Sequence, residues 1–334
     1  MKMKWENSAH VEGYLFSIAD EKGRNKLQKA ITGPNSKVPN TEYIRGVVNI
    51  ATDPEGLNVV AVHFGFLKKY TAAGKVNSTY TLLEKLIDAD ANGTLNSFEV
   101  CGTDAITLRI DGDVEVNDFL GRDGEMIAAK RFRGAFAHNL TSEINPDRAA
   151  TFSTDMLIVN AINREVENGD DYMQLKGYCF NFRGDLLPVT YNVRTPEGIH
   201  YFEDKEISPS NPFLTKVWGN MTTSVQKSVK EIESAFGAQA VETTTQTFHS
   251  WDVIGCSKEP MEFDDEATLT CAEFEQKLGE RSERVAAEKQ RTLDWQASRN
   301  AAPSGFTAAP FDGGVVVGTA PAAAAPTAKD DFMF

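Results

Sequence analysis

Basic and aromatic side chains alternate in the segment "AAKRFRGAF", which contains Lys130, Arg131, Phe132 and Arg133. Successive side chains of a strand point to opposite faces, so Arg131 and Arg133 are expected on one face and Phe132 on the other with Lys130. Flat rings beside cations suit single-stranded nucleic acid, because bases stack on the rings and cations contact the phosphates.

Two further segments have the same character: "GYCFNFR", and an expected loop that carries Lys68, Lys69, Tyr70 and Lys75. In "GYCFNFR", Tyr178, Phe180 and Phe182 are expected to form one aromatic row, with Arg183 on the opposite side. The alternative is that this row belongs to a hydrophobic core and that the arginine pair lies on a solvated strand face. The nucleic-acid-binding residues that the sequence predicts are Arg45, Lys68, Lys69, Tyr70, Lys75, Lys130, Arg131, Phe132, Arg133, Lys176, Tyr178, Phe180, Phe182 and Arg183.

An acidic segment, "DADANGTLNSFE", fits the pattern of an EF-hand calcium loop. A helix-forming segment precedes it, but a strand-like segment follows it. The alternative is therefore an acidic turn between a helix and a strand. The candidate calcium ligands are Asp88, Asp90, Asn92, Thr94 and Glu99, and no other cofactor is expected.

Catalytic signatures are absent from the sequence. It contains no phosphate-binding glycine loop of the Walker type, no H-E-x-x-H and no G-x-S-x-G, and its five histidines are scattered singly. We therefore predict that the protein is not an enzyme.

Composition restricts the protein's mode of nucleic-acid binding and its cellular compartment. The formal net charge is −14, which argues against indiscriminate coating of nucleic acid but leaves room for a local basic groove. Four dispersed cysteines without a C-x-x-C pair suit free thiols in a reducing compartment. No apolar run is long enough to span a bilayer, and no signal peptide is evident, so a cytoplasmic protein without membrane contact is expected.

The secondary-structure elements that must position these residues occur in the same order twice along the chain. Residues 41–145 contain strand-like segments interrupted by one helix-like segment at 79–87, and residues 150–258 repeat this order with a helix expected at 224–236. Short strands with one helix before the closing strands are typical of the five-stranded OB-fold. The predicted fold class is mainly β with some helix: two OB-fold-like barrels, a C-terminal helix and a disordered tail.

The remaining segments flank these two domains. Residues 1–40 carry seven basic and four acidic side chains and are expected to form a basic N-terminal lead-in. Thr270 and Glu273 predict a capping box at the start of a C-terminal helix within 265–299. The Ala-, Gly- and Pro-rich composition of 300–334 predicts a disordered linker that ends in an acidic, Phe-terminated tip.

The tip, "DDFMF", resembles the C-terminus of single-stranded DNA-binding proteins of bacteria and their phages. In that family the terminal Phe fills an apolar pocket of a replication or repair protein, and basic residues hold the carboxylates. The resemblance implies partner binding by Asp330, Asp331, Phe332 and Phe334. This tip departs from the bacterial pattern in having two acids only and Met333 in place of the usual proline.

The sequence thus predicts a single-stranded DNA-binding protein. It would coat exposed strands in replication, recombination or repair, and recruit proteins of those processes through its tip. Two barrels in one chain suggest a phage-type version that acts in the host cytoplasm. The alternative is a virion or assembly protein whose β-modules make protein–protein contacts.

Overall fold

The computed structural model describes residues 3–20, 23, 25–165, 171–232 and 240–301. The chain forms one compact unit, Met1–Gln290, and a second, Arg291–Phe334, of which the end of the last helix is described. The elements in chain order are β1 (Asn7–Ser17), β2 (Gln28–Ile31), β3 (Glu42–Ala51), β4 (Val59–Lys68), α1 (Ser78–Ala91), α2 (Phe98–Cys101), η1 (Gly102–Asp104), β5 (Thr107–Leu120), β6 (Met126–Asn139), η2 (Pro146–Arg148), β7 (Ala150–Arg164), β8 (Tyr172–Phe180), β9 (Leu186–Val193), α3 (Pro196–Glu203), β10 (Phe213–Ile232), β11 (Ala240–Cys256) and α4 (Cys271–Ala301).

The first barrel is a closed ring of five strands. β1 pairs with β3, β3 with β4, and β5 with both β6 and β1, all antiparallel, while β4 and β6 close the ring as a short parallel pair. α1 connects β4 to β5. This pairing pattern, with the helix after the third strand of the ring, is that of an OB-fold.

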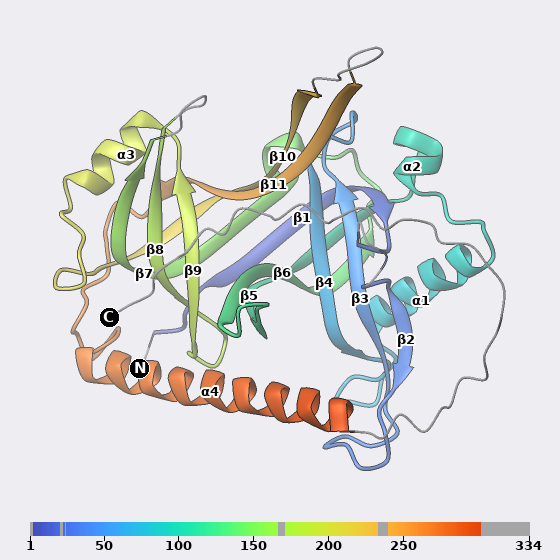
Figure 1. Ribbon diagram of the computed structural model, residues 1–334, viewed down its shortest axis with the longest axis horizontal. Coiled ribbons are helices and arrows are strands. Elements are labelled where there is room, and N and C mark those ends of the chain that lie inside the picture. The colour runs from blue at the N-terminus through green and yellow to red at the C-terminus, as the bar shows by residue number, and fades with distance from the viewer. Residues whose placement is uncertain (1–2, 21–22, 24, 166–170, 233–239, 302–334) are drawn as a thin grey trace. The chain divides into compact units, whose positions relative to one another are not determined.

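The second barrel repeats the pattern. β7 pairs with β8 and β10, β8 with β9, and β10 with β11, while β9 and β11 form the parallel pair and α3 connects β9 to β10. β1 also pairs with β7, so the two rings share one continuous sheet, as Figure 1 shows with β1 between the two sets of strands. The predicted fold class, mainly β with two OB-like barrels and a C-terminal helix, is confirmed.

Alternation of buried and exposed residues produces the barrel interiors. In β4, Val60, Val62 and Phe64 are buried, and the intervening residues lie on the outer face. β8 is covered on both faces, since Cys179 packs into the main core while Tyr178 and Phe180 pack in a second cluster with side chains of α4.

α4 begins with the predicted capping box. The Glu273 amide donates to Thr270 Oγ1 at 3.2 Å, and the Thr270 amide donates to Glu273 Oε2 at 3.5 Å. Phe274 and Leu278 then pack against the cluster that covers β8. No helix in the described part of the chain has the length and apolarity needed to cross a bilayer.

Two expectations about elements are wrong. Residues 1–40 are not only a lead-in, because β1 lies between β5 and β7 and its polar side chains find distant partners, such as Glu12, which accepts from the Asn145 amide at 2.8 Å. The helix expected at 224–236 is strand as far as Ile232, and 233–236 lie outside the described residues. Continuous pairing of β10 with β11 overrides the local helix propensity there. The helix of the second barrel is α3 instead.

Candidate nucleic-acid interface

A bulge in the first barrel turns an aromatic side chain outward. The register of β3 and β4 shifts between Ile44 and Gly46, so Ile44 faces Leu67 and Tyr43 faces Lys68. Gly46 permits this because its φ of 132° is unfavourable for other residues, and a Cβ there would lie 2.5 Å from the Leu27 Cα. Beyond the bulge, Phe66 is 44% exposed although the even-numbered residues before it point into the core.

Rings and cations gather around Phe66. We call Tyr43, Phe66, Lys68, Lys69 and Tyr70 the outer patch. The Tyr43 and Phe66 ring centroids are 4.5 Å apart, and the Lys68 Nζ lies 5.6 Å from the Phe66 centroid. Lys69 lies 6.0 Å from the ring of Tyr70, which is 53% exposed. The outer patch therefore presents exposed rings beside cations.

The two lysines of the outer patch differ in their partners. Lys69 Nζ lies 2.5 Å from Glu42 Oε2, and this hydrogen bond raises the pKa of Lys69. Lys68 has no carboxylate partner among the described residues. Arg45 is exposed on β3, and Lys75 is exposed in the turn whose ends are joined by the Tyr70–Val76 bridge. Lys68 is thus free to contact a phosphate.

The second barrel also places arginines over aromatic rings, of which Tyr172 is half-buried and Phe182 is exposed. The Arg194 guanidinium lies 5.0 Å from the Tyr172 ring and 3.1 Å from Asp252 Oδ1. Arg183 lies 5.1 Å from the ring of Phe182, which is 73% exposed just beyond the end of β8. Phe182 and Arg183 therefore lie where a nucleic-acid strand can reach them.

Arg131 and Arg133 share the outer face of β6, as the alternation predicts, but each faces a carboxylate across the sheet. Arg131 Nε and Nη2 donate to Glu115 Oε2 at 2.9 and 2.7 Å. Arg133 Nε donates to Asp113 Oδ1 at 2.7 Å, and this hydrogen bonding raises the pKa of Arg133. Since these pairs neutralise both arginines, phosphate contact by them remains a prediction with a weaker basis than that of Lys68.

Four predicted contact residues are wrong, because their side chains are buried. Phe132 fills the interior of the first barrel, and Lys176 is 8% exposed within β8. Tyr178 and Phe180 do form one row, but the Tyr178 ring lies 5.4 Å from Phe274 of α4, and the Phe180 ring stacks 3.9 Å from Trp5. A base cannot stack on a ring that another element already covers.

A cleft separates the outer faces of the two barrels, with a volume of about 130 Å³. We call it the inter-barrel cleft. β4 and β6 of the first barrel and β10 and β11 of the second supply its walls. Its lining residues are Val60, Ala61, His63, Lys130, Arg131, Phe132, Met221, Thr222, Thr223, His249, Ser250 and Trp251.

Lys130 crosses from one barrel to the other within this cleft. Its Nζ donates to the Thr190 carbonyl oxygen and lies 4.4 Å from the Tyr191 ring and 4.9 Å from the Trp251 ring. Burial lowers the pKa of Lys130 to about 7. Burial also lowers the pKa of His63, and the nearby charge of Arg131 lowers it further. Lys130 is thus a group in the cleft whose charge changes near neutral pH.

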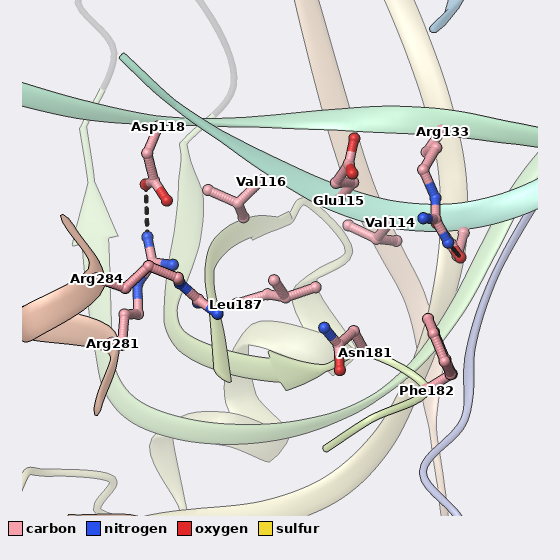
Figure 2. A pocket seen from close by; sticks show the side chains of 11 residues that line it. Val114, Glu115, Val116, Asp118, Arg133, Asn181, Phe182, Leu187, Arg281 and Arg284 are labelled. Carbon is pink, nitrogen blue, oxygen red and sulfur yellow. Dashed lines mark hydrogen bonds and ion pairs between the residues drawn. The ribbon is translucent and has the colours of Figure 1, made fainter. Parts of the chain in front are cut away.

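A second pocket lies under α4, and we call it the α4 pocket. Figure 2 shows Arg281 directed at Asp118, with Arg284 beside it and Phe182 on the opposite side. The Arg281 Nη2 lies 2.6 Å from Asp118 Oδ1, and both side chains are largely shielded from solvent. Because its cations face carboxylates, the α4 pocket is electrostatically balanced.

The predicted calcium ligands occupy two different elements. Asp88 and Asp90 lie within α1, Asn92 caps that helix, and Glu99 lies in the first turn of α2. Lys29 Nζ lies 2.9 Å from Asp88 Oδ1, and Lys26 Nζ lies 2.5 Å from Asp90 Oδ2. Thr94 Oγ1 donates to the Ala89 carbonyl. In the described part of the chain, no three His, Cys, Asp or Glu side chains are grouped to hold a metal. Calcium binding remains a prediction.

The sequence missed several candidate residues. Tyr43, Phe66, Tyr172, Arg194 and Trp251 lie beside the cations described above. A glycine within a strand-like segment, here Gly46, is a known sign of a bulge and could have indicated that Phe66 points outward. The predicted partner-binding residues Asp330, Asp331, Phe332 and Phe334 lie outside the described residues.

Comparison with known proteins gives a family match and several similar solved structures. A family model described as YorF matches residues 6–291. None of the curated proteins compared with the chain matches it. Among solved structures, the single-stranded DNA-binding protein of Thermus aquaticus is similar at 10% identity and a TM-score of 0.44, covering 78% of this chain and 96% of that one. A deletion mutant of the same protein is similar at 10% identity and a TM-score of 0.44, covering 79% of this chain and 98% of that one.

Proposed function

We propose that this chain, which belongs to the YorF family, binds single-stranded DNA on the outer surface of its barrels and coats exposed strands in replication, recombination or repair. The proposal depends chiefly on one observation: exposed Phe66 lies beside Lys68 on β4, the third ring strand of an OB-type barrel, and against Tyr43 of β3, the second ring strand. That surface is where OB-folds bind oligonucleotides.

The outer patch suits a strand of any sequence. Every base has a flat face that can stack on Phe66 or Tyr70, and stacking contributes about 1–3 kcal/mol per base. Lys68 supplies a charge for the phosphates, and Arg45 on the paired strand β3 and Lys75 in the turn after β4 are also exposed. Because contact with phosphate releases counterions, affinity falls as salt rises. The action is non-catalytic, since bound protein holds strands open by mass action.

A strongly acidic chain can still bind a polyanion locally. The net charge of −14 is spread over the whole sequence, and screening limits its reach to about 8 Å at physiological ionic strength. The cations around Lys68 act on a bound phosphate over a distance shorter than this screening length. All four cysteines are free thiols, which supports a cytoplasmic location.

Partner recruitment is the second part of the proposal. Asp330, Asp331 and Phe334 would dock on replication or recombination proteins, with the Phe334 ring as the anchor. Deletion of 330–334 is expected to leave DNA affinity equal or slightly higher and to abolish capture of these proteins in pull-downs. Capture of the same proteins by the truncated chain would contradict recruitment by the tip.

A titration of fluorescent oligo-dT tests the DNA-binding proposal. Phe66→Ala is expected to weaken binding about tenfold by removing one stacked base, and Lys68→Ala is expected to flatten the slope of log affinity against log salt by about 0.7. Lys205→Ala is the matched control, because Lys205 lies over another ring, Tyr201, at 4.8 Å. An assembly protein would show no salt-sensitive binding at all.

A further inference from the structure

A tight turn joins β8 to β9 and carries Phe182 and Arg183 at its tip. The Gly184 amide donates to the Asn181 carbonyl at 2.9 Å, and the Asn181 amide donates to the Asp185 carbonyl at 3.1 Å. Gly184 closes the turn with a φ of 77°, which other residues rarely adopt. Phe182 and Arg183 therefore project from the tip, and both are exposed.

The Asn181 side chain holds this turn from within. Its Oδ1 accepts from the Arg183 and Asp185 amides, both at 2.9 Å, and its Nδ2 donates to Asp185 Oδ2 at 2.8 Å. Asparagine is favoured in turns because its side chain can bond to the backbone two residues further on. The local conformation of the turn is therefore determined by its own residues.

α4 holds the same turn from outside. Lys277 Nζ donates to the Gly184 carbonyl at 2.6 Å, and Arg284 Nη1 lies 3.8 Å from Asp185 Oδ2. Gly184 is buried at this contact, although the two residues before it are exposed. A hydrogen bond from a charged donor is shorter and stronger than one from a neutral donor. Lys277 therefore ties the backbone of the turn to the helix.

Lys277 is held in place because α4 is anchored on the second barrel one helical turn before it. Phe274 packs in the cluster that covers β8, and its ring lies 5.4 Å from that of Tyr178. Residues three apart are neighbours on a helix surface, so Lys277 faces the second barrel together with Phe274. Arg281 is not part of this anchor, because it faces β5 of the first barrel.

The tip of the turn repeats the arrangement of the outer patch. Phe182 is 73% exposed, and the Arg183 guanidinium lies 5.1 Å from its ring. In the outer patch, the Lys68 Nζ lies 5.6 Å from the ring of Phe66. Among the described residues, Arg183 has no carboxylate partner. An exposed ring beside an unpaired cation suits a base and its phosphate.

The tip also adjoins the barrel that carries the outer patch. Phe182 and Arg133 both line the α4 pocket, as Figure 2 shows. Arg133 lies on β6, which pairs with β4 at His63, and β4 carries Phe66. Phe182 therefore projects beside the outer surface of the first barrel.

We infer that Lys277 is a positioning residue for single-stranded DNA: its hydrogen bond to the Gly184 carbonyl fixes the turn that presents the Phe182 ring to a base and Arg183 to a phosphate. This role rests on the proposed function and extends DNA binding to a second stacking surface, on the other barrel. Lys277 itself does not touch the strand. Because the turn is already held before DNA arrives, less conformational entropy is lost on binding.

Titration of fluorescent oligo-dT with variants of Lys277 tests this positioning role. Lys277→Met keeps the length of the side chain but removes the donor, and it is expected to weaken binding about fivefold. Lys277→Arg retains a charged donor and is expected to bind within about twofold of wild type. Lys289→Met is the matched control, because Lys289 also belongs to α4 but lies 3.4 Å from Glu125 Oε2 in the turn between β5 and β6. It should leave the affinity unchanged.

A second background separates positioning from a direct phosphate contact. The double variant Phe182→Ala, Arg183→Ala removes the groups that the turn presents and is expected to weaken binding about tenfold or more. In this background, Lys277→Met should cause no further loss of affinity and no change in the slope of log affinity against log salt. A direct phosphate contact by Lys277 would instead lower the affinity again and flatten the slope by about 0.7, and it would overturn the positioning role.

Asn181→Ala loosens the turn by an independent route and keeps the test decisive even if Lys277→Met does not fold. It removes the hydrogen bonds to the Arg183 and Asp185 amides. Binding should weaken in the otherwise wild-type chain and stay unchanged in the background that lacks both tip side chains. Equal losses in the two backgrounds would show that the turn acts only through the stability of the barrel, which contradicts the positioning role.

Phe66→Ala separates failure of the positioning role from failure of the proposed function. If Phe66→Ala weakens oligo-dT binding while Lys277→Met or the double variant at the tip binds like wild type, the positioning role is wrong and the proposed function stands. If the wild-type protein does not bind oligo-dT, both are wrong. Rescue by Lys277→Arg, together with the absence of a further loss in the tip background, supports the positioning role.

Discussion

The inter-barrel cleft and the α4 pocket both contain basic side chains, but the partners of these side chains differ. In the α4 pocket, Arg281 faces Asp118 at 2.6 Å, and Arg133 faces Asp113 in a two-bonded pair. In the inter-barrel cleft, Arg131 is paired with Glu115, whereas Lys130 meets a carbonyl oxygen and two rings. An arginine that a carboxylate already neutralises stabilises the fold, and a cation without such a partner can bind a ligand.

The largest effect is expected from breaking the pair in the α4 pocket. Arg281→Ala leaves Asp118 charged and shielded from water, so the free energy of unfolding should fall by about 3 kcal/mol. Urea unfolding measures the loss, and the double variant Arg281→Met, Asp118→Leu should restore much of it by removing both charges. Oligo-dT affinity of the folded Arg281→Ala protein should not change. A selective loss of affinity would place Arg281 in the binding surface.

The pH dependence of stability is expected to differ between paired and unpaired cations. The pKa of Lys130 is lowered by burial to about 7 in the folded chain, against an ordinary value of 10.5. Between these values the unfolded chain binds more protons, so the free energy of unfolding rises with pH by up to about 1.4 kcal/mol per pH unit. The contribution is level below pH 7 and above pH 10.5.

Urea unfolding from pH 7 to pH 9 checks this slope against Lys130→Met, which should lack it. Arg133→Gln is the paired counterpart and should retain the wild-type slope, because the pKa of Arg133 is raised and the group stays charged throughout. Identical slopes for wild type and Lys130→Met would show that Lys130 is charged in the fold at all these pH values.

A carboxylate placed in the cleft should convert it to the character of the α4 pocket. Ala61 lines the cleft on the same face of β4 as His63, so Ala61→Asp adds an acid that can pair with the cations. Oligo-dT affinity should fall about tenfold, and the salt slope should decrease by about 0.7. Ala61→Asn matches the size without the charge and should bind within a factor of two or three. Equal losses in both variants would indicate a steric effect.

The smallest effect concerns the acidic segment from Asp88 to Glu99, whose aspartates already have lysine partners. A calcium ion must displace Lys29 and Lys26, so millimolar calcium is expected to raise the melting temperature by about 1–2 °C relative to EDTA. Glu99→Gln should remove this rise. Identical melting curves in calcium and EDTA would exclude a calcium site in this segment.

Local sequence signals predicted much of the fold. Alternating apolar residues identified most strands, and the order of strands and helix indicated two OB-like barrels, which the pairing confirms. Thr270 and Glu273 identified the start of α4 because a capping box is complete within four residues. The assignment failed for β1 and for β10, where pairing with residues far along the chain decides the conformation.

The sequence by itself determined which residues share a face of a strand, because that follows from the geometry of one extended segment. Tyr178 and Phe180 lie on one face, and Arg131 and Arg133 on another, as the alternation requires. Only the tertiary structure decided which of these faces meets solvent. α4 covers Tyr178, acids on β5 pair with both arginines, and a bulge exposes Phe66. Exposure and charge pairing depend on the element that packs opposite, which no local pattern encodes.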